Sequence, residues 1–166
     1  GYLKQFYTKM GFEKIRGCVI ATDLHYSVAD NTWARVNDDG TVTLGMTDIA
    51  QNLAGPILHA KAKKVGTIRK KGRPIATVES GKWVGPVKSP ISGEIIALNE
   101  NLISDAQLLN RSPYKDGWVV QMQPSNLEED LAAMTTGDDA VAAYTEKIEQ
   151  DGIEACKHIE GTDNYD

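Results

Sequence analysis

Lys82 is the residue whose type and position most clearly suggest chemistry. It follows Gly81 in the run Val78-Glu-Ser-Gly-Lys-Trp-Val84, and short strands bounded by glycine and proline are predicted on both sides. Glycine can adopt a positive φ without a steric clash, so Gly81 is expected to close a tight hairpin and leave Lys82 projecting into solvent. An exposed amine on a rigid turn is accessible to a modifying enzyme. The pattern suggests an acceptor for a covalent group, although exposed lysines are more often only solubilising charges.

The elements that must position this lysine are predicted to be mainly short strands. Alternating polar and apolar residues, together with glycine and proline at the boundaries, indicate the strands. They are expected at 15–21, 33–36, 41–46, 57–62, 74–79, 84–88, 92–98 and 117–122.

Helices are predicted where capping residues precede a helical pattern, with acidic residues in the first turn of the last two. These helices are expected at 48–53, 105–109, 126–134 and 140–150, with Gly137 separating the last two. Residues 151–166 are polar and are expected to fray or to be disordered.

Several short motifs follow one another along residues 25–136, about two thirds of the chain. They are Trp33-Ala-Arg-Val36, Asp39-Gly-Thr-Val-Thr-Leu-Gly-Met-Thr-Asp-Ile-Ala-Gln51, Val65-Gly66, Glu79-Ser-Gly-Lys82, Ser89-Pro-Ile-Ser-Gly-Glu-Ile95, Asn99-Glu-Asn-Leu102 and Ser112-Pro-Tyr-Lys-Asp-Gly-Trp118. In this order and at similar spacing, they resemble the H protein of the glycine cleavage system, which is a lipoyl carrier. A chance match would have to reproduce the spacing of the motifs as well as their residues, so the ordered set is a far stronger signal than any single motif.

The resemblance implies a mainly β fold: a lipoyl-domain barrel-sandwich hybrid of two small antiparallel sheets, with short helices and C-terminal helices. It divides the chain into an N-terminal extension (1–24), a lipoyl domain (25–123) and a C-terminal helical extension with a tail (124–166). In the N-terminal extension, Tyr2, Phe6, Tyr7 and Phe12 are expected mainly to pack in the core, and the alternative is an extra helix or strand packed on the barrel.

The same resemblance implies that Lys82 is lipoylated by a lipoate-attaching enzyme. Glu79, Ser80, Gly81 and Trp83 would be recognised during modification, with Glu79 and Ser80 exposed. Biotin is the competing prosthetic group, but a biotinylated lysine is usually flanked by methionines, and here the flanks are Gly81 and Trp83. Acylation would replace the ammonium with a neutral amide and add a long apolar arm ending in a dithiolane. The chain is then a carrier that serves partner enzymes and is not itself catalytic.

Two departures from the family pattern bear on the cargo. The chain has Asn31-Thr32-Trp33 where the family has His-Glu-Trp, and Trp83-Val-Gly-Pro86 where the family has Ala-Ala/Thr-Ser-Asp. Both family carboxylates are therefore missing. An aminomethyl cargo is cationic near neutral pH and needs a carboxylate partner in a partly dry cleft.

These departures resemble the lipoate-binding proteins of the heterodisulfide-reductase-like sulfur-oxidation system. That reading predicts sulfur-bound cargo on the arm and a heterodisulfide-reductase-like complex as partner. Two alternatives remain open. One is a glycine cleavage H protein that carries an aminomethyl group between the glycine cleavage enzymes, and the other is a lipoyl relay protein.

Cys18 and Cys156 lie far apart in the sequence and form no metal or redox spacing motif. They are expected to be reduced thiols, with Cys18 buried in a strand. A functional alternative is thiol exchange between Cys18 and the dithiolane. The three histidines show no ligand spacing, so no metal site is expected.

Charge is unevenly distributed along this chain of net charge −5. Residues 61–88 hold nine basic side chains and Glu79 as the only acid, whereas residues 126–166 hold twelve acids against Lys147 and Lys157. The basic stretch lacks interleaved aromatics, which argues against nucleic-acid binding. It is expected to lie on the same side as the hairpin and to steer the carrier toward acidic partners. No run is long enough to span a membrane and no leader is visible, so a cytoplasmic protein is expected.

Overall fold

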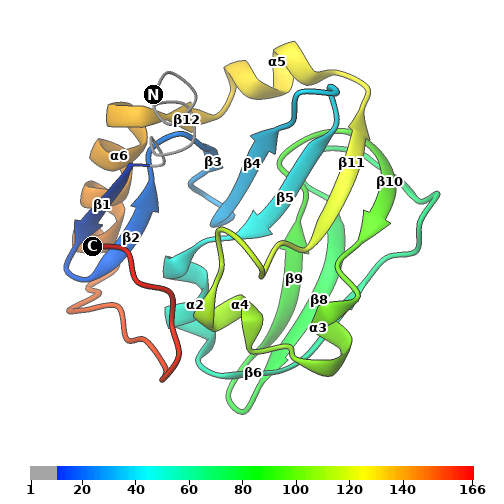
Figure 1. Cartoon of the computed structure of the whole chain (residues 1–166). Coiled ribbons are helices and arrows are strands. Elements are labelled where there is room, and N and C mark those ends of the chain that lie inside the picture. Colours follow the sequence, from blue (N-terminus) through cyan, green and yellow to red (C-terminus); the bar gives the residue numbers. More distant parts are fainter. Residues whose placement is uncertain (1–10) are drawn as a thin grey trace, which may run out of the picture.

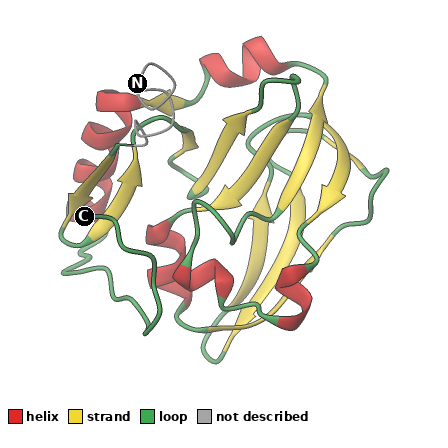
Figure 2. Ribbon diagram, in the orientation of Figure 1, coloured by secondary structure: helices red, strands yellow, loops and turns green. Residues whose placement is uncertain are grey.

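A computed structural model gives the fold of residues 11–166, which are the residues described below. Short antiparallel strands dominate it (Figures 1 and 2). The strands are β1 (Phe12–Ile15), β2 (Cys18–Ala21), β3 (His25–Ser27), β4 (Thr32–Val36), β5 (Val42–Met46), β6 (Ile57–Ala62), β7 (Ile68–Arg69), β8 (Pro74–Ser80), β9 (Val84–Lys88), β10 (Gly93–Leu98), β11 (Val120–Pro124) and β12 (Thr135–Thr136). The helices are α2 (Asp48–Ala54), α3 (Asn101–Ser104), α4 (Leu108–Arg111), α5 (Leu127–Ala132) and α6 (Gly137–Gln150).

The strands form three antiparallel sheets. The largest has seven strands in the order β12-β3-β4-β5-β11-β10-β7, a second has the order β6-β8-β9, and β1 and β2 form a separate hairpin. The mainly β prediction, with antiparallel sheets, short helices and C-terminal helices, is confirmed. The described residues form three sheets and not the expected two small ones. The strands β3 and β12 extend one edge of the large sheet, and β1 and β2 form a sheet of their own.

Two apolar clusters hold these layers together. The first joins the large sheet to the three-stranded sheet, with Leu44 and Ile95 from one meeting Ile75 and Val78 from the other. In β8 the inward positions alternate with exposed Thr77 and Glu79, the two-residue period of a half-buried strand. The second cluster gathers the β1–β2 hairpin, α6 and the C-terminal residues around aromatic side chains. Its large members are Tyr26, Trp33, Tyr114 and Tyr144.

Most predicted elements lie where the sequence placed them, and the misses have local causes. The predicted helix 105–109 is two short helices, α3 and α4. The Asn99 side chain accepts a hydrogen bond from the Asn101 amide and donates to the carbonyl oxygens of Asp116 and Trp118, so helical structure begins at Asn101, before the predicted start at residue 105. The predicted strand 15–21 was wrong in its first part, because a turn with positive φ at Arg16 and Gly17 separates β2 from β1, which was not predicted. The sequence prediction also omitted β3, β7 and β12, because two or three residues show no readable periodicity.

The prediction for residues 151–166 was wrong. This segment, which we call the C-terminal strap, is packed against the body of the protein, with Ile153, Cys156 and Tyr165 buried in the second cluster. In Figure 1 the strap is red and loops beneath the β1–β2 hairpin to reach α2. Its apolar residues are too widely spaced to show a helical or strand pattern, so the sequence alone suggested disorder.

The N-terminal expectation is confirmed for Phe12, which lies in β1 and packs edge-on against Tyr165 with ring centroids 4.9 Å apart. Tyr2, Phe6 and Tyr7 lie outside the described residues. Within residues 11–166, no helix combines the length and apolar character that crossing a membrane requires.

Candidate functional site

Lys82 lies in the turn that connects β8 to β9. The Ser80 amide donates to the Trp83 carbonyl oxygen at 2.8 Å, which closes the turn. The Ser80 hydroxyl donates to the Ala54 carbonyl oxygen at the end of α2 and accepts the Lys82 amide at 3.4 Å. The prediction that a positive φ at Gly81 makes the turn was wrong, because Gly81 is not among the residues with positive φ. The hydroxyl of Ser80 anchors the turn instead.

The Lys82 side chain is exposed and lies over the end of α2. Gly55 follows α2 with φ +76°, and a Cβ built on it would lie 3.1 Å from the Lys82 Cε and 3.8 Å from its Nζ. The missing side chain of Gly55 therefore leaves room for the lysine stem. Among residues 11–166 no carboxylate forms an ion pair with Lys82. The exposure expected from the sequence is present.

The neighbours of Lys82 differ from the expectation in one respect. Glu79 is exposed, as predicted, and lies opposite Val84 in the hairpin. Ser80 was predicted to be exposed but is only 5% exposed, because its hydroxyl is used against α2. Trp83 is 39% exposed and its ring covers Gly85, where a Cβ would come within 2.2 Å of the ring.

A cleft of about 140 Å³ lies beside Trp83, and we call it the Trp83 cleft. It is where the structure brings together the positions at which the sequence departs from the family pattern, Thr32 and Pro86. The Thr32 hydroxyl is buried without a hydrogen-bond partner among the described residues. The full lining is Asp30, Asn31, Thr32, Met46, Ala50, Leu53, Ala54, Trp83, Pro86 and Val87. Sequence reasoning missed Asp30, which could have been noticed as the acid two residues before Thr32.

Lys82 itself lines two hollows away from the Trp83 cleft, between the end of α2 and the strap. The hollows have volumes of about 410 and 280 Å³. They share Lys82, Asn52 and Lys157, so we treat them as one groove, the strap groove. Its remaining lining is Gln51, Leu53, Gly55, Pro56, Ile153, Glu154, Ala155, His158 and Ile159. The hairpin tip is therefore a ridge with Trp83 on one side and Lys82 on the other.

Cys18 and Cys156 are bonded to each other, so the prediction of two reduced thiols was wrong. Cys18 is fully buried and Cys156 is 7% exposed. A free Cys18 thiol for exchange with the arm, the functional alternative, is absent in this state. The disulfide could not be predicted from the sequence, because the two cysteines are 138 residues apart and only the folded chain brings β2 against the strap.

A buried carboxylate connects α2, β2 and the strap. Asp48 accepts hydrogen bonds from the Val19 amide at 2.8 Å and from the Gln51 side chain at 3.0 Å, and it pairs with His158 Nε2 at 2.8 Å. The hydrogen bond to Asp48 raises the pKa of His158, against an opposing effect of desolvation and of Lys14. The ion pair holds the strap on α2.

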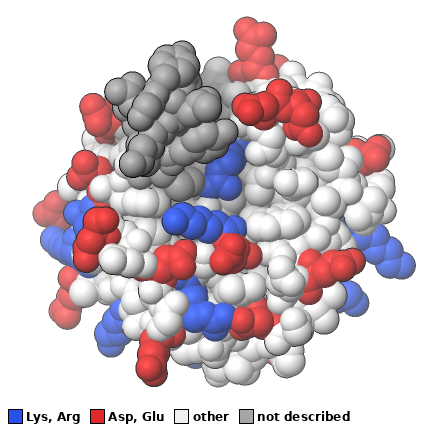
Figure 3. All heavy atoms as spheres, in the orientation of Figure 1, with Lys and Arg blue, Asp and Glu red and all other residues white. Residues whose placement is uncertain are grey.

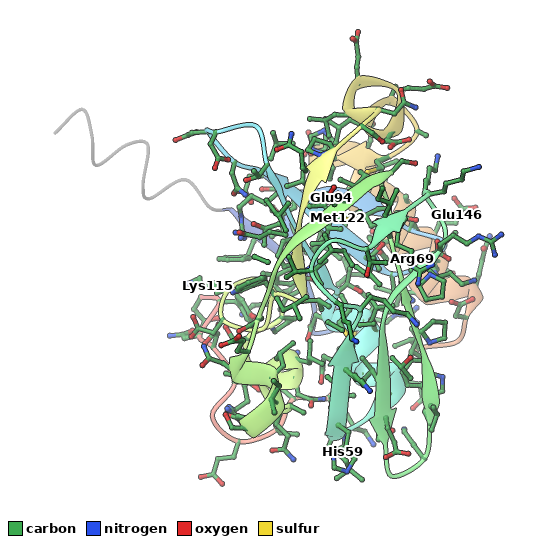
Figure 4. The ribbon with its side chains drawn as sticks, turned by 90° about the vertical axis from the view of Figure 1, so that its right-hand side faces the viewer. His59, Arg69, Glu94, Lys115, Met122 and Glu146 are labelled. Atoms are coloured by element: carbon green, nitrogen blue, oxygen red, sulfur yellow. A yellow bond between two sulfur atoms is a disulfide. The ribbon has the colours of Figure 1, made fainter. Side chains whose placement is uncertain are left out.

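Most of the basic side chains of residues 61–88 lie away from the hairpin tip, although Lys61 and Lys88 belong to the same three-stranded sheet as the hairpin. Lys88 lies opposite Pro74 at the start of β8, whereas Glu79 lies opposite Val84 near the turn. The seven residues of β8 separate its two ends by about 20 Å. Figure 4 shows His59, which pairs with Glu79, near the hairpin end, and Arg69 well away toward the other end of the molecule.

Comparison with known proteins gives one consistent result. The family model described as glycine cleavage H-protein matches residues 24–148. Glycine cleavage system H protein 2 of Aquifex aeolicus is 46% identical over 141 residues, covering 85% of this chain and 88% of that protein. A probable glycine cleavage system H protein 2 of Sulfurisphaera tokodaii is 40% identical over 147 residues, covering 87% and 98%. The crystal structure of a glycine cleavage system H protein from Mycobacterium marinum superposes with a TM-score of 0.65 at 27% identity, covering 81% of this chain and all of that one.

Proposed function

We propose, because this chain belongs to the glycine cleavage H-protein family, that Lys82 is its lipoylated residue and that the hairpin presents the resulting arm to partner enzymes. Members of this family are non-catalytic carriers with lipoate attached to a lysine. The observation that carries the proposal is the exposed Lys82 in the β8–β9 turn, with no carboxylate paired to it among residues 11–166.

The residues around Lys82 fit this role. Ser80 fixes the turn against α2, so the lysine is offered on a rigid support, and Gly55 leaves room for its stem. Glu79 and Trp83 are exposed on either side and are available to a lipoate-attaching enzyme. Attached lipoate supplies a disulfide ring that opens and closes by thiol exchange.

Intact mass spectrometry tests this assignment. Protein made in cells that synthesise lipoate is expected to carry the mass of one lipoyl group, and Lys82→Arg is expected to carry none. Lys88→Arg is the matched control, because Lys88 is an exposed lysine on the same hairpin. A lipoyl group retained in Lys82→Arg and lost in Lys88→Arg would contradict the proposal.

For the cargo, family membership favours an aminomethyl group passed between glycine cleavage enzymes. Within the Trp83 cleft, Asp30 is the carboxylate available to such a cation, although it is exposed. An exposed carboxylate contributes little attraction, because water screens it. A lipoyl relay role would use the same lysine.

One observation favours sulfur-bound cargo as a second candidate. Thr32 and Pro86 line the Trp83 cleft at the two positions that hold carboxylates in the family pattern, and Trp83 adds an apolar face. A neutral, polarisable cargo suits such a lining better than a cation does. The partner would then be a heterodisulfide-reductase-like complex.

Asp30→Asn separates the two candidates, with Asp38→Asn as an exposed control outside the cleft. Lipoylated protein is offered to a glycine decarboxylase and to a sulfur-oxidising complex of this type. Loading by glycine decarboxylase that weakens in Asp30→Asn supports the aminomethyl cargo. Turnover by the sulfur-oxidising complex alone, unchanged by Asp30→Asn, supports the sulfur cargo.

A further inference from the structure

The strap is attached to α2 and to the β1–β2 hairpin by contacts that converge near Lys82. The Lys157 amide donates to the Asn52 side chain at 2.7 Å, and the Lys157 carbonyl oxygen accepts from the Gln51 side chain at 2.8 Å. The disulfide to Cys18 lies one residue earlier, and the pair between His158 and Asp48 lies one residue later. Successive strap residues are thus fixed, and the strap forms a firm wall.

The wall lies outside the residues that the family model covers. That model matches residues 24–148, whereas the strap begins at residue 151 and Cys18 precedes residue 24. The disulfide therefore joins two segments that both lie outside the range of the model.

The Lys82 stem already points into the groove that this wall creates. Its Cε lies over Gly55, and its side chain lines both hollows between α2 and the strap. Carbon surface is available from Leu53, Ile153 and Ala155 in one hollow, and from Pro56 and Ile159 in the other. An apolar chain attached to the lysine would bury carbon surface there, which the hydrophobic effect favours.

The groove has a mixed lining in which the charged side chains lie beside carbon surface. Lys157, His158 and Glu154 are its charged or titratable members besides Lys82 itself. Acylation would replace the Lys82 ammonium with a neutral amide and place an apolar chain against the carbon surface.

We propose that the strap groove is a binding site for the lipoyl arm of this same chain, separate from the Trp83 cleft, in which the acyl chain rests between α2 and the strap. This inference rests on lipoylation of Lys82 as proposed above. The strap groove lies on the Lys82 side of the hairpin ridge and the Trp83 cleft on the other, and Leu53 is the one residue that their linings share.

Hydrogen exchange with mass spectrometry tests the proposal on lipoylated and unlipoylated protein, after intact mass has confirmed the attachment. Lipoylation is expected to slow amide exchange in residues 153–159, which border only the strap groove, by severalfold. Residues 30–32 and 83–87, which border the Trp83 cleft, are expected to change less. Protection confined to residues 30–32 and 83–87, or no protection in a chain that carries lipoate, overturns the groove site alone. Failure of lipoate to attach overturns the proposed function as well.

Two variants at Ala155 distinguish occupation of the groove by the arm from a general decrease in the flexibility of the protein on lipoylation. Ala155 is exposed and lines the groove, so Ala155→Phe is expected to fill it without disturbing the core. The added protection on lipoylation should disappear in Ala155→Phe and persist in Ala155→Ser, while both variants keep the disulfide. Equal protection in the two variants would show that the arm does not occupy the groove.

Discussion

Ser80 fixes the turn that presents Lys82, because one hydroxyl contacts both α2 and the turn itself. Replacement by alanine leaves the Ala54 carbonyl oxygen without its donor and frees the Lys82 amide. We expect Ser80→Ala to lower the free energy of unfolding by about 1–2 kcal/mol and to slow lipoylation by loosening the turn. Urea unfolding and a time course of intact mass measure the two effects. Thr77→Ala, on the exposed face of the same strand, should change neither, and a similar loss in it would contradict the assignment to Ser80.

Thr32 supplies a second prediction, because its hydroxyl is buried without a partner among residues 11–166. A buried, unsatisfied polar group costs about 1–3 kcal/mol. Thr32→Val keeps the shape of the side chain, and we expect it to raise the free energy of unfolding of the unlipoylated protein by about 1 kcal/mol.

Thr43 is the matched control for Thr32. It is also buried, but its hydroxyl accepts hydrogen bonds from Asn37 at 3.0 Å and Gln121 at 3.1 Å. Thr43→Val is therefore expected to lower the free energy of unfolding in the same urea experiment. Destabilisation of equal size in both variants would mean that the Thr32 hydroxyl has a partner, such as bound water.

At the residue level, the sequence could identify Lys82 but not the residues that support it. Lys82 was recognisable because its neighbours along the chain form a motif. The role of Ser80 depends on Ala54, and the Trp83 cleft depends on Asp30 and Thr32, which are distant in sequence. Contacts of this kind arise only when α2 and the hairpin come together. The sequence therefore predicted Gly81 as the source of the turn, although the anchoring group is one residue earlier.

Elements were predictable in proportion to their length and regularity. The strands β6 and β9 occupy the predicted residues because alternation and flanking glycine or proline mark them clearly. The strap has no such periodicity: it is held by a disulfide, by hydrogen bonds and by three widely spaced buried side chains, Ile153, Cys156 and Tyr165. Each of these depends on partners elsewhere in the chain, so no local pattern could have predicted it.

The pair between His158 and Asp48 makes attachment of the strap dependent on pH. The groups that face His158 are Asp48 from α2, Lys14 from β1, and Lys82 and Lys157 in the groove. Because the hydrogen bond to Asp48 raises the pKa of His158 in the folded state, protonation is favoured by folding. The resulting stability is fully present below the unfolded pKa of about 6.5 and is lost as the pH rises through the folded pKa.

We therefore expect the free energy of unfolding to fall between about pH 5.5 and pH 8.5, and to fall less in His158→Asn. Urea unfolding at the two values gives the comparison. Hydrogen exchange of residues 153–159 should quicken over the same range in the wild type. An identical pH dependence in His158→Asn would show that other groups cause the effect.

The basic residues 61–88 and the acidic C-terminal region do not form two separate charged faces, because acidic and basic side chains are interspersed on the face shown in Figure 3. Most basic side chains of residues 61–88 lie toward the start of β8, about 20 Å from the turn. Acidic side chains of the C-terminal region cover other surfaces, including α5 at the top of the face in Figure 3. The basic stretch therefore does not surround the hairpin tip. Electrostatic steering by this stretch would bring the part of the carrier that lies away from the hairpin tip toward an acidic partner. These basic residues are close to Lys82 in the sequence, but the antiparallel pairing of β8 and β9 places Lys88 and the residues before β8 at the end of the hairpin away from the turn.

The disulfide ties the two ends of the described chain together, so its contribution belongs to the whole molecule. It joins residues 138 apart in sequence and restricts the unfolded chain strongly, which in the chain-entropy account stabilises a protein by about 5 kcal/mol. We expect Cys18→Ala combined with Cys156→Ala to lower the melting temperature by about 10–20 °C, since 1 kcal/mol shifts it by about 2–4 °C at this size.

Calorimetry of the double variant, and of the wild type with and without a strong reductant, measures this contribution. Reduced wild type and the double variant should melt at similar temperatures, because both lose the same constraint while α2 keeps its hydrogen bonds to Lys157. A melting temperature unchanged by both treatments would mean that the bond does not constrain the chain. The strap would then be held by its polar contacts and its buried side chains, and the groove beside Lys82 would need no oxidising condition to form.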